Sequence, residues 1–450
     1  MHFFLRILFI ILVVTVPSLA QAFELRIMLT KATFPAVYFT DEEVIIEDGS
    51  ENLYKITNKH NLQLSMSGNK LFFEGNSFPL PVTLYNNENR FFINGKGYRG
   101  KLEVKEINGK YVFINLINLE EYLRGVVSKE MPASWPLEAL KAQAVIARTY
   151  AIYKATKTNR VGFDLYDSTM DQVYYGLEGE SSSGDMAVTY TKDIVILHDN
   201  EIIKSYYHST SGGRTEEPIN VWGDDYPYLE STICGYDRQS PSYTWEYKVS
   251  RKKMNELLRK SGYAAKTLQR MRPLKYTSSG RNRIISLVYK DRTKAEILGV
   301  DLRTLVGNVK VKSTKFQILN RRDSFIFRGK GSGHGVGLCQ WGARGMADKG
   351  FTFEAILNKY YRDISLSKLS FLNDINDDFI GSTIQDEFDK DLTEDAVTTE
   401  DPFYTKDTNK TFTTEEPHVH EDDNLGIFLN DIDNVNPQDN NRIPLDKVVR

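Results

Sequence analysis

One acidic side chain, Glu130, is the strongest candidate for chemistry in this sequence. The apolar residues Met131, Pro132 and Trp135 follow it closely, and such surroundings disfavour a charged carboxylate and raise its pKa. A carboxyl group that keeps its proton near neutral pH can donate it to a departing oxygen as a general acid. The alternative is that Glu130 caps the next helix or pairs with Lys129, as solvated glutamates often do.

Polar side chains continue through the helix that the next residues predict. Lys141 and Arg148 are seven residues apart, which is two helical turns, so we expect them to share one face. An acid held above a cationic helical face could protonate a leaving oxygen and bind a polar polymer. The residues we assign to binding here are Lys141, Gln143, Arg148 and Tyr150.

The start of this helix carries several local signals. Ser134 is a plausible N-cap, Pro136 fits the first turn, and Glu138 adds negative charge near the positive end of the helix dipole. Pro132 biases Met131 away from helical geometry, which predicts that Glu130 lies on a non-helical turn. Three- and four-residue steps predict a buried stripe of Leu137, Leu140, Ala144, Ala147 and Ala151.

Two loops rich in glycine and small polar residues are further candidates for binding. Glycines allow positive φ angles and a close approach of the backbone to a ligand. The alternative is a tight turn between packed elements. The loop that contains His334 is not a phosphate loop, because the Lys-Ser/Thr ending is missing. The residues assigned to a substrate-contacting wall are His208, Ser209, Ser211, Gly212, Gly213, Thr215, His334, Gln340 and Trp341.

Only two cysteines occur, Cys234 and Cys339. The sequence leaves open whether they pair, and neither has a neighbouring cysteine at metal-binding spacing. Cys339 with His334 suggests a nucleophilic cysteine as a distant alternative. No cation near Cys339 in the sequence would stabilise its thiolate, which disfavours this interpretation.

The first 22 residues have the pattern of a secretory signal. Arg6 precedes an apolar run over residues 7–16, and Ala20-Gln21-Ala22 is a small-x-small cleavage site. An uncleaved anchor is the alternative, but the apolar run is shorter than the roughly 20 residues that span a membrane comfortably. We therefore predict export to the periplasm or cell envelope, with no stable membrane span after cleavage.

Charge is distributed unevenly along the chain. The net charge is -3, yet residues 371–450 contain 21 Asp+Glu and 6 Lys+Arg, a net charge of -15. Residues 1–370 hold the other 39 acidic and 51 basic residues, a net charge of +12. The basic body suits an anionic or polar polymer. The acidic tail, residues 373–450, cannot bury enough apolar area to offset its ordering entropy and is predicted to be disordered.

The remaining pattern predicts an α+β fold of mixed short strands and helices around a substrate groove. Residues 23–105 read as an N-terminal β-rich region, with Asn94-Gly95 as one of its turns and Asn108-Gly109 following it. Residues 106–372 are predicted to form the catalytic domain.

Several blocks together resemble the SpoIID/LytB family, the stage II sporulation protein D group. They are Glu130-Met131-Pro132, the helix over residues 139–151, Tyr207 to Gly213, Val221 to Gly223 and Gly333 to Ala343. The resemblance runs from about residue 98 to residue 365. It implies an exported lytic transglycosylase that acts on peptidoglycan glycan strands stripped of their stem peptides.

The resemblance also implies roles for particular residues. Glu130 matches the family's acid, and Lys141 and Arg148 match its helix cations. Ordinary glycoside hydrolysis usually needs two carboxylates. In a lytic transglycosylase the muramic 6-hydroxyl attacks its own anomeric carbon and closes a 1,6-anhydro ring, so one acid that later acts as base is sufficient.

Partners and cofactors follow from the same resemblance. We expect glycan strands as substrate, an N-acetylmuramoyl-L-alanine amidase as a candidate partner, no nucleic acid and no cofactor. Some relatives bind zinc through Cys, His and Cys, but this chain has Tyr166, Met170 and Asp171 there, so we expect no metal. The alternative function is a non-catalytic wall-binding module that stimulates the amidase.

Overall fold

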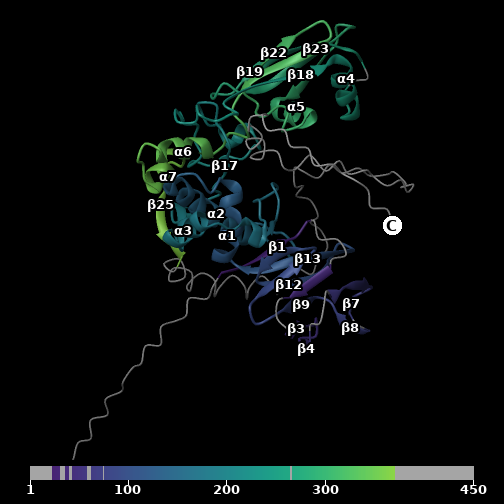
Figure 1. The fold of residues 1–450 in the computed structure, drawn as a ribbon. Helices are drawn as coiled ribbons and strands as arrows, with labels where there is room; N and C mark the ends of the chain where they lie inside the picture. The colour runs from purple at the N-terminus through teal and green to yellow at the C-terminus, as the bar shows by residue number, and fades with distance from the viewer. Residues whose placement is uncertain are drawn as a thin grey trace, which may run out of the picture.

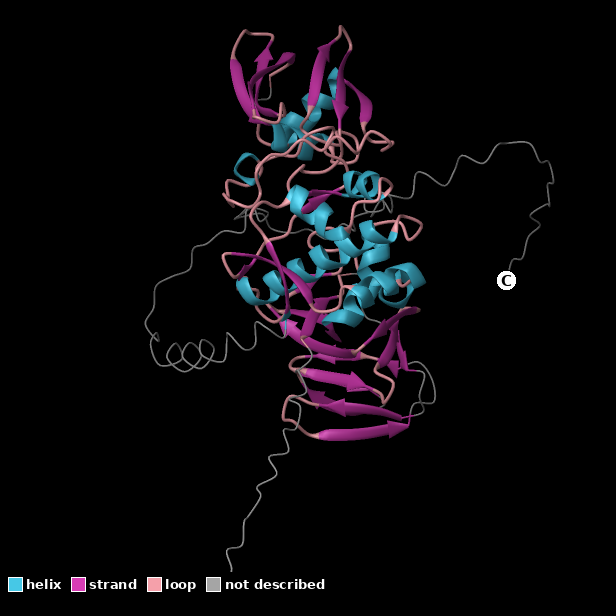
Figure 2. Cartoon of the chain, turned by 90° about the vertical axis from the view of Figure 1, so that its left-hand side faces the viewer, coloured by secondary structure: helices cyan, strands magenta, loops and turns pink. Residues whose placement is uncertain are grey.

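The computed structural model describes residues 23–30, 36–39, 43–57, 62–73, 75–263 and 266–369. The predicted signal peptide and the predicted disordered tail lie outside the described residues. The fold is α+β, as predicted, with short strands in several sheets and helices between them. The N-terminal strands lie at one end of the molecule, the helices in the middle, and a second strand-rich module at the other end (Figures 1 and 2).

The N-terminal region is built from short alternating strands. A seven-stranded sheet has the order β14-β1-β13-β12-β9-β3-β4. Asn108-Gly109 joins β12 to β13 with φ angles of 51° and 74°, the positive values that two-residue hairpin turns require. The strands are β1 Glu24–Met28, β2 Ala36–Phe39, β3 Glu43–Glu47, β4 Leu53–Thr57, β5 Leu62–Gln63, β6 Ser65–Ser67, β7 Lys70–Phe73, β8 Asn76–Pro79, β9 Val82–Tyr85, β10 Arg90–Ile93, β11 Lys96–Arg99, β12 Lys101–Ile107, β13 Lys110–Asn118 and β14 Leu165–Tyr166.

The middle of the molecule is organised around one buried helix, α2 (Leu137–Lys157). It packs against α1 (Leu119–Glu130), α3 (Ser182–Tyr190), α6 (Gln340–Ala347) and α7 (Phe353–Tyr360) (Figure 1). Four of the five predicted stripe residues, Leu140, Ala144, Ala147 and Ala151, are buried, and Leu137 is half-buried. Burial also extends beyond the stripe, because buried residues run without a break from Ala142 to Ile152. A helix that is surrounded by other elements buries every face.

Two local predictions at the start of α2 are wrong. Glu130 is the last residue of α1 rather than part of a non-helical turn. The restriction that Pro132 imposes acts one residue later, at Met131, whose backbone is extended with φ -130° and ψ 137°. Pro136, not Ser134, is the N-cap of α2, and it makes no side-chain capping bond.

Short strands after α3 bring distant loops together. β17 (Tyr207–His208) pairs in parallel with β24 (Leu338–Cys339), so the two glycine-rich loops lie side by side. The remaining short elements here are η1 Gly176–Gly179, β15 Ile194–His198, β16 Glu201–Ile202, η2 Pro218–Asn220 and β25 Ser365–Lys368.

The strand-rich module at the far end has a hydrophobic core of its own. Its two three-stranded sheets have the orders β18-β23-β22 and β19-β20-β21. Among the described residues, no helix combines the length and the apolar character needed to cross a membrane. The module contains β18 Thr244–Ser250, α4 Arg251–Lys260, β19 Leu268–Tyr276, β20 Asn282–Tyr289, β21 Lys294–Leu298, α5 Gly299–Val306, β22 Phe316–Asn320 and β23 Ser324–Lys330.

Candidate functional site

Glu130 is half-buried at the C-terminal end of α1, where three chain segments meet. Its Oε1 accepts a hydrogen bond of 2.8 Å from the backbone N–H of Val173. Its backbone carbonyl accepts one of 2.9 Å from Nε2 of Gln340, the first residue of α6. The same Nε2 is 3.3 Å from Oε1 of Gln143 on α2. The structure therefore brings together three of the predicted site residues. Gln143 and Gln340 are buried, so their predicted contact with substrate is corrected to support of Glu130.

The surroundings of Glu130 favour its protonated form. Burial raises the pKa of the Glu130 carboxyl group to about 7, although the Val173 N–H and the neighbouring Tyr207 hydroxyl favour the charged form. Met131 and Trp135, which follow Glu130 in the sequence, are both buried. The Trp135 ring meets the Trp341 ring edge-on, with 4.9 Å between the ring centroids. The predicted rise in the pKa is confirmed, and the carboxyl group is poised to exchange a proton near neutral pH.

Tyr207 is a site residue that sequence reasoning missed. Its hydroxyl group is buried, and within the described part of the chain no hydrogen bond of normal geometry satisfies it. Burial, and next the negative charge of Glu130, raise the pKa of Tyr207 well above its ordinary value. The residue opens the Tyr207–Gly213 block, so its position directly before His208 was the available signal.

The histidines of the two glycine-rich loops lie against each other. Nδ1 of His208 is 3.0 Å from the carbonyl oxygen of Val336, while Nδ1 of His334 accepts the N–H of Val336 at 3.1 Å. The ring centroids are 5.7 Å apart. Burial lowers the pKa of His208 well below its ordinary value and that of His334 to about 3, so both imidazoles are neutral at pH 7.

An aromatic wall adjoins His334. The Trp222 ring lies 4.9 Å from the His334 ring and is stacked on Tyr206 at 4.4 Å. Tyr206, Trp222 and His334 are all half-buried, so each residue keeps some surface exposed to solvent. Rings of this kind offer an apolar face with hydrogen-bonding edges, the combination that suits a sugar.

Arg148 is not placed to contact a ligand, and we correct its assignment. Its side chain is 0% exposed and forms a two-pronged ion pair with Glu120, with N···O distances of 2.6 and 2.7 Å. It also donates to the carbonyl oxygen of Ile194 at 3.1 Å. The seven-residue spacing to Lys141 is real, but the face of α2 that carries Arg148 is packed inside the protein. Arg148 therefore holds α1, α2 and β15 together.

Lys141 and Tyr150 are also engaged inside the protein. Nζ of Lys141 lies 2.7 Å from Oε1 of Glu138, and the side chain is 19% exposed. The Tyr150 hydroxyl donates to Oδ1 of Asp171 at 3.3 Å, and Tyr150 is buried. The Lys141 ammonium group remains partly exposed. The predicted contact of Tyr150 with substrate is corrected, because Tyr150 is buried and supports the site from inside.

The small polar residues after His208 shape their loop rather than line an opening. The Ser211 hydroxyl and the Gly212 N–H donate to Oδ2 of Asp237 at 2.7 and 2.8 Å. Gly213 has a φ of 98°, which favours glycine. Because Ser209, Ser211 and Thr215 are buried, we correct their predicted contact with substrate. Asp237 organises this loop and was not predicted.

Comparisons with known proteins match the segment that carries Glu130. Residues 107–198 match the family described as stage II sporulation protein, and residues 224–337 match a domain of unknown function (DUF8618). An uncharacterized protein of Brachyspira hyodysenteriae is 32% identical over 337 residues, which cover 75% of this chain and 88% of that protein. The Bacillus subtilis stage II sporulation protein D is 31% identical over 277 residues, 57% of this chain and 77% of that protein.

The chain belongs to the stage II sporulation protein D family. The amidase enhancer of Bacillus subtilis is also similar, 30% identical over 376 residues that cover 73% of this chain. This chain spans 51% of the length of that relative. The SpoIID/LytB resemblance found in the sequence is therefore confirmed.

In this family member Cys339 is not placed as a nucleophile. It is 0% exposed, and burial raises the pKa of its thiol well above the ordinary value. Cys234 and Cys339 are both free thiols, and their sulfurs and a carboxylate oxygen of Asp237 all lie within 4.8 Å of one another. The structure speaks against hydrolysis by Cys339 and His334.

The segment that contains Tyr166, Met170 and Asp171 is held by charge pairs. The Asp171 carboxylate is fully buried, accepts the N–H of Tyr166 at 2.8 Å, lies 3.2 Å from Nζ of Lys154 and pairs with Arg160. Met170 is exposed and offers no buried ligand. The ion pairs of Asp171 with Lys154 and Arg160 thus hold this segment in place.

Proposed function

We propose that this protein is a lytic transglycosylase that cleaves the bond between N-acetylmuramic acid and N-acetylglucosamine in glycan strands free of stem peptides. The observation that carries the proposal is Glu130, a half-buried carboxyl group with a pKa of about 7 in the segment matched by the family. We further propose that residues 1–22 export the chain, so that it acts in the periplasm or cell envelope.

The proposed reaction uses the two oxygens of Glu130 differently. Oε1 accepts the Val173 N–H, so the proton of the neutral acid belongs on Oε2. Oε2 donates this proton to the departing glycosidic oxygen as the bond to the anomeric carbon breaks. The muramic 6-hydroxyl attacks the same carbon, and its proton passes to the Glu130 carboxylate. The acid is regenerated, and the product has a 1,6-anhydro end.

Neighbouring residues support this chemistry without taking part in bond breaking. Gln340 holds the backbone of Glu130 and so fixes the end of α1. The buried Tyr207 hydroxyl lies beside the carboxylate and can stabilise its charged form after proton transfer. The neutral His334 and the Trp222 ring provide polar and apolar contacts for sugar rings. Substrate held in this way reacts intramolecularly, which replaces an activated water.

A second candidate function is stimulation of an amidase without intrinsic cleavage. It is favoured by the similarity to the amidase enhancer over 73% of this chain. Under this proposal the partner would be an N-acetylmuramoyl-L-alanine amidase, whose action supplies strands without stem peptides.

The products of the purified protein decide between these functions. Incubation with amidase-treated glycan strands, followed by mass spectrometry, should reveal fragments with 1,6-anhydro-muramic ends. Fragments with ordinary reducing ends would mean hydrolysis and would overturn the proposed reaction. No fragments, together with faster release of stem peptides by an added amidase, would establish the enhancer function instead.

The raised pKa of Glu130 predicts a pH dependence of cleavage. The general acid must be protonated in the free enzyme, and its protonated fraction falls as the pH rises above about 7. We therefore expect kcat/KM to decrease about tenfold per pH unit on the alkaline side. The measurement is initial rate at low substrate between pH 5 and 9, with circular dichroism confirming that the protein stays folded. A rate that keeps rising through pH 8 would contradict this role.

A further inference from the structure

The positive charge of the folded part is concentrated in one module. Residues 244–330, from β18 to β23, contain 23 Lys+Arg and 6 Asp+Glu, a net charge of +17. The rest of residues 1–370 contains 28 basic and 33 acidic residues, a net charge of -5. The affinity for anionic polymers that the sequence predicts for the whole body therefore belongs to this module. It lies outside the segment that matches the sporulation protein family.

The strand register places several of these cations on one side of the sheet β19-β20-β21. Directly opposed residues share a face, and Arg270 lies opposite Val288, which lies opposite Lys294. Two further cross-strand rows lie on the same face. One consists of Arg272, Ser286 and Glu296, and the other of Lys275, Ile284 and Leu298. The other face carries Met271, Ile285, Leu287 and Ile297 into the core of the module. We call Arg270, Arg272, Lys275 and Lys294 the basic face.

The basic face is open to a partner. All four of its cations are exposed, and among the described residues none of them makes an ion pair. Elsewhere in the module, Lys266 is paired with Asp291 at 2.7 Å and Arg328 with Glu246 at 2.5 Å. The cations of β19 and β21 stand two strand spacings apart, about 9.6 Å. Arg270, Arg272 and Lys275 form a row along β19, while β21 contributes Lys294 and the exposed acid Glu296 to the same face. A row of cations of this kind suits an extended chain with regularly spaced negative groups.

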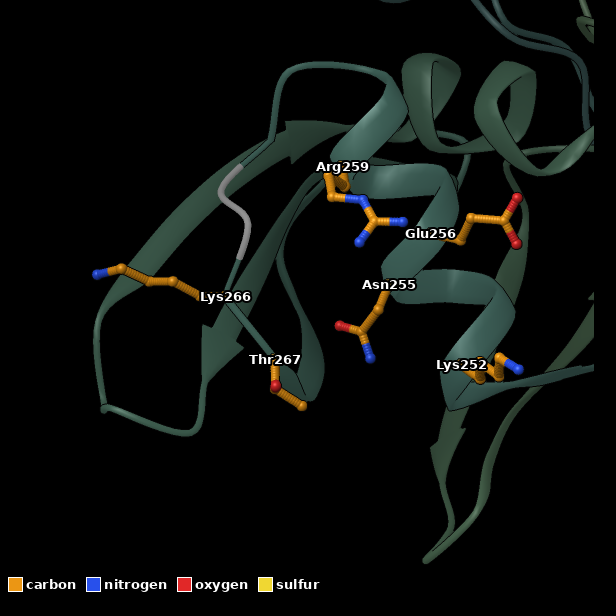
Figure 3. Close-up of a pocket in the computed structure, with 6 residues that line it drawn as sticks. All are labelled: Lys252, Asn255, Glu256, Arg259, Lys266 and Thr267. Atoms are coloured by element: carbon orange, nitrogen blue, oxygen red, sulfur yellow. The ribbon is translucent and has the colours of Figure 1, made fainter.

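The surface of β20, between β19 and β21, suggests what kind of chain the basic face binds. Ile284, Ser286 and Val288 form a low floor, and Leu298 is 47% exposed at its edge. Apolar patches between cations fit the ring faces of sugars that carry carboxylates. A second, mainly cationic feature is a hollow of about 400 Å³, lined by Lys252, Glu256 and Arg259 of α4 and by Lys266 ahead of β19 (Figure 3). It adds to the positive field that draws an anionic polymer to the module.

We propose that the basic face binds the carboxylates of glycan strands from which the stem peptides have been removed. This inference rests on the proposed function. Hydrolysis of the amide between muramic acid and its peptide adds one water and leaves a free lactyl carboxylate directly on every second sugar. In an intact strand the same group is an uncharged amide. The basic face thereby captures processed strands for Glu130.

Binding without turnover tests this proposal. In full-length Glu130→Gln protein, we compare the variant Arg270→Gln, Arg272→Gln, Lys275→Gln and Lys294→Gln with a control that removes the same charge from exposed lysines outside the module. The control is Lys70→Gln, Lys110→Gln, Lys192→Gln and Lys349→Gln. The probes are amidase-treated strands and the same strands with their carboxylates methyl-esterified.

The basic-face variant should bind amidase-treated strands at least about tenfold more weakly, because four exposed charge contacts are lost. Affinity should also become less sensitive to salt. The control should stay within about twofold, and esterification should weaken the parent as much as the four substitutions do. Equal weakening in both variants, or tight binding of esterified strands, would overturn the proposal. So would binding that appears only after deletion of residues 373–450, since the acidic tail would then occupy the face.

The outcome is separable from that of the proposed function. Cleavage is measured with the basic-face variant that keeps Glu130, on short strands at saturating concentration. If the variant has lost binding but still forms 1,6-anhydro products, both proposals are supported. If proteins with the unaltered basic face bind strands through the carboxylates, but the protein with Glu130 forms no 1,6-anhydro products, only the proposal on the basic face is supported.

Discussion

Glu130→Gln should reduce the rate of glycan cleavage by about 10²–10⁴-fold. Glutamine keeps the size of the side chain and can still meet the Val173 N–H through its amide oxygen. It cannot release a proton to the glycosidic oxygen or accept one from the 6-hydroxyl. The loss should therefore appear mainly in kcat, measured as the rate of 1,6-anhydro product formation. A variant with undiminished product would remove Glu130 from the reaction.

A matched control separates chemistry from charge and folding. Glu178→Gln removes the same charge from an exposed residue in the family-matched segment and should leave the rate unchanged. Glu130→Gln should also be at least as stable as the parent at pH 8. The pKa of Glu130 is raised from 4.5 to about 7 in the folded state, so stability falls as the pH rises from about 4.5 to 7, and the full penalty is present at pH 8. Glutamine removes that penalty. Thermal unfolding at pH 8 checks this.

Local chemistry was enough to predict the character of Glu130 but not its exact setting. The apolar residues Met131 and Trp135 indicated a raised pKa, because burial acts on any carboxyl group in such company. The helix boundary was missed by one residue, since Pro132 restricts Met131 and leaves Glu130 free to end α1. The hairpin at Asn108-Gly109 was also predictable from local sequence, because the geometry of its turn is set by two residues.

Contacts between distant segments could not be predicted in this way. Tyr207 reaches Glu130 because β17 pairs with β24, a contact between segments about 130 residues apart in the chain. The seven-residue spacing placed Lys141 and Arg148 on one face, yet periodicity does not say whether that face meets solvent. The net charge of the body similarly concealed its concentration in residues 244–330. The first two depend on how elements pack, which a local pattern does not encode. The charge of residues 244–330 can be counted from the sequence, but the strand register is needed to place four of its cations on one face.

Glu120→Gln should lower the free energy of unfolding by about 3–5 kcal/mol, because it removes one partner of a buried ion pair. The Arg148 guanidinium is 0% exposed, and Glu120 neutralises it through contacts of 2.6 and 2.7 Å. Glutamine keeps one acceptor oxygen but no negative charge, so the guanidinium would face only neutral acceptors, the new amide oxygen and the carbonyl oxygens of Val188 and Ile194. Urea-induced unfolding at pH 7 measures the loss. A Glu120→Gln variant as stable as the parent would contradict the structural role.

The double variant Glu120→Gln with Arg148→Met separates a structural role of Arg148 from a role in binding. Methionine removes the buried charge and fills much of the same space, so stability should recover in large part. If Arg148 acts only through the fold, the recovered double variant should cleave glycan at close to the parent rate. A stable double variant with a strongly raised KM would instead mean that the guanidinium reaches the substrate, in a conformation that opens the contact between α1 and α2. Because both halves of the pair lie in the segment matched by the family, this comparison tells whether its cation at position 148 serves the fold or the ligand.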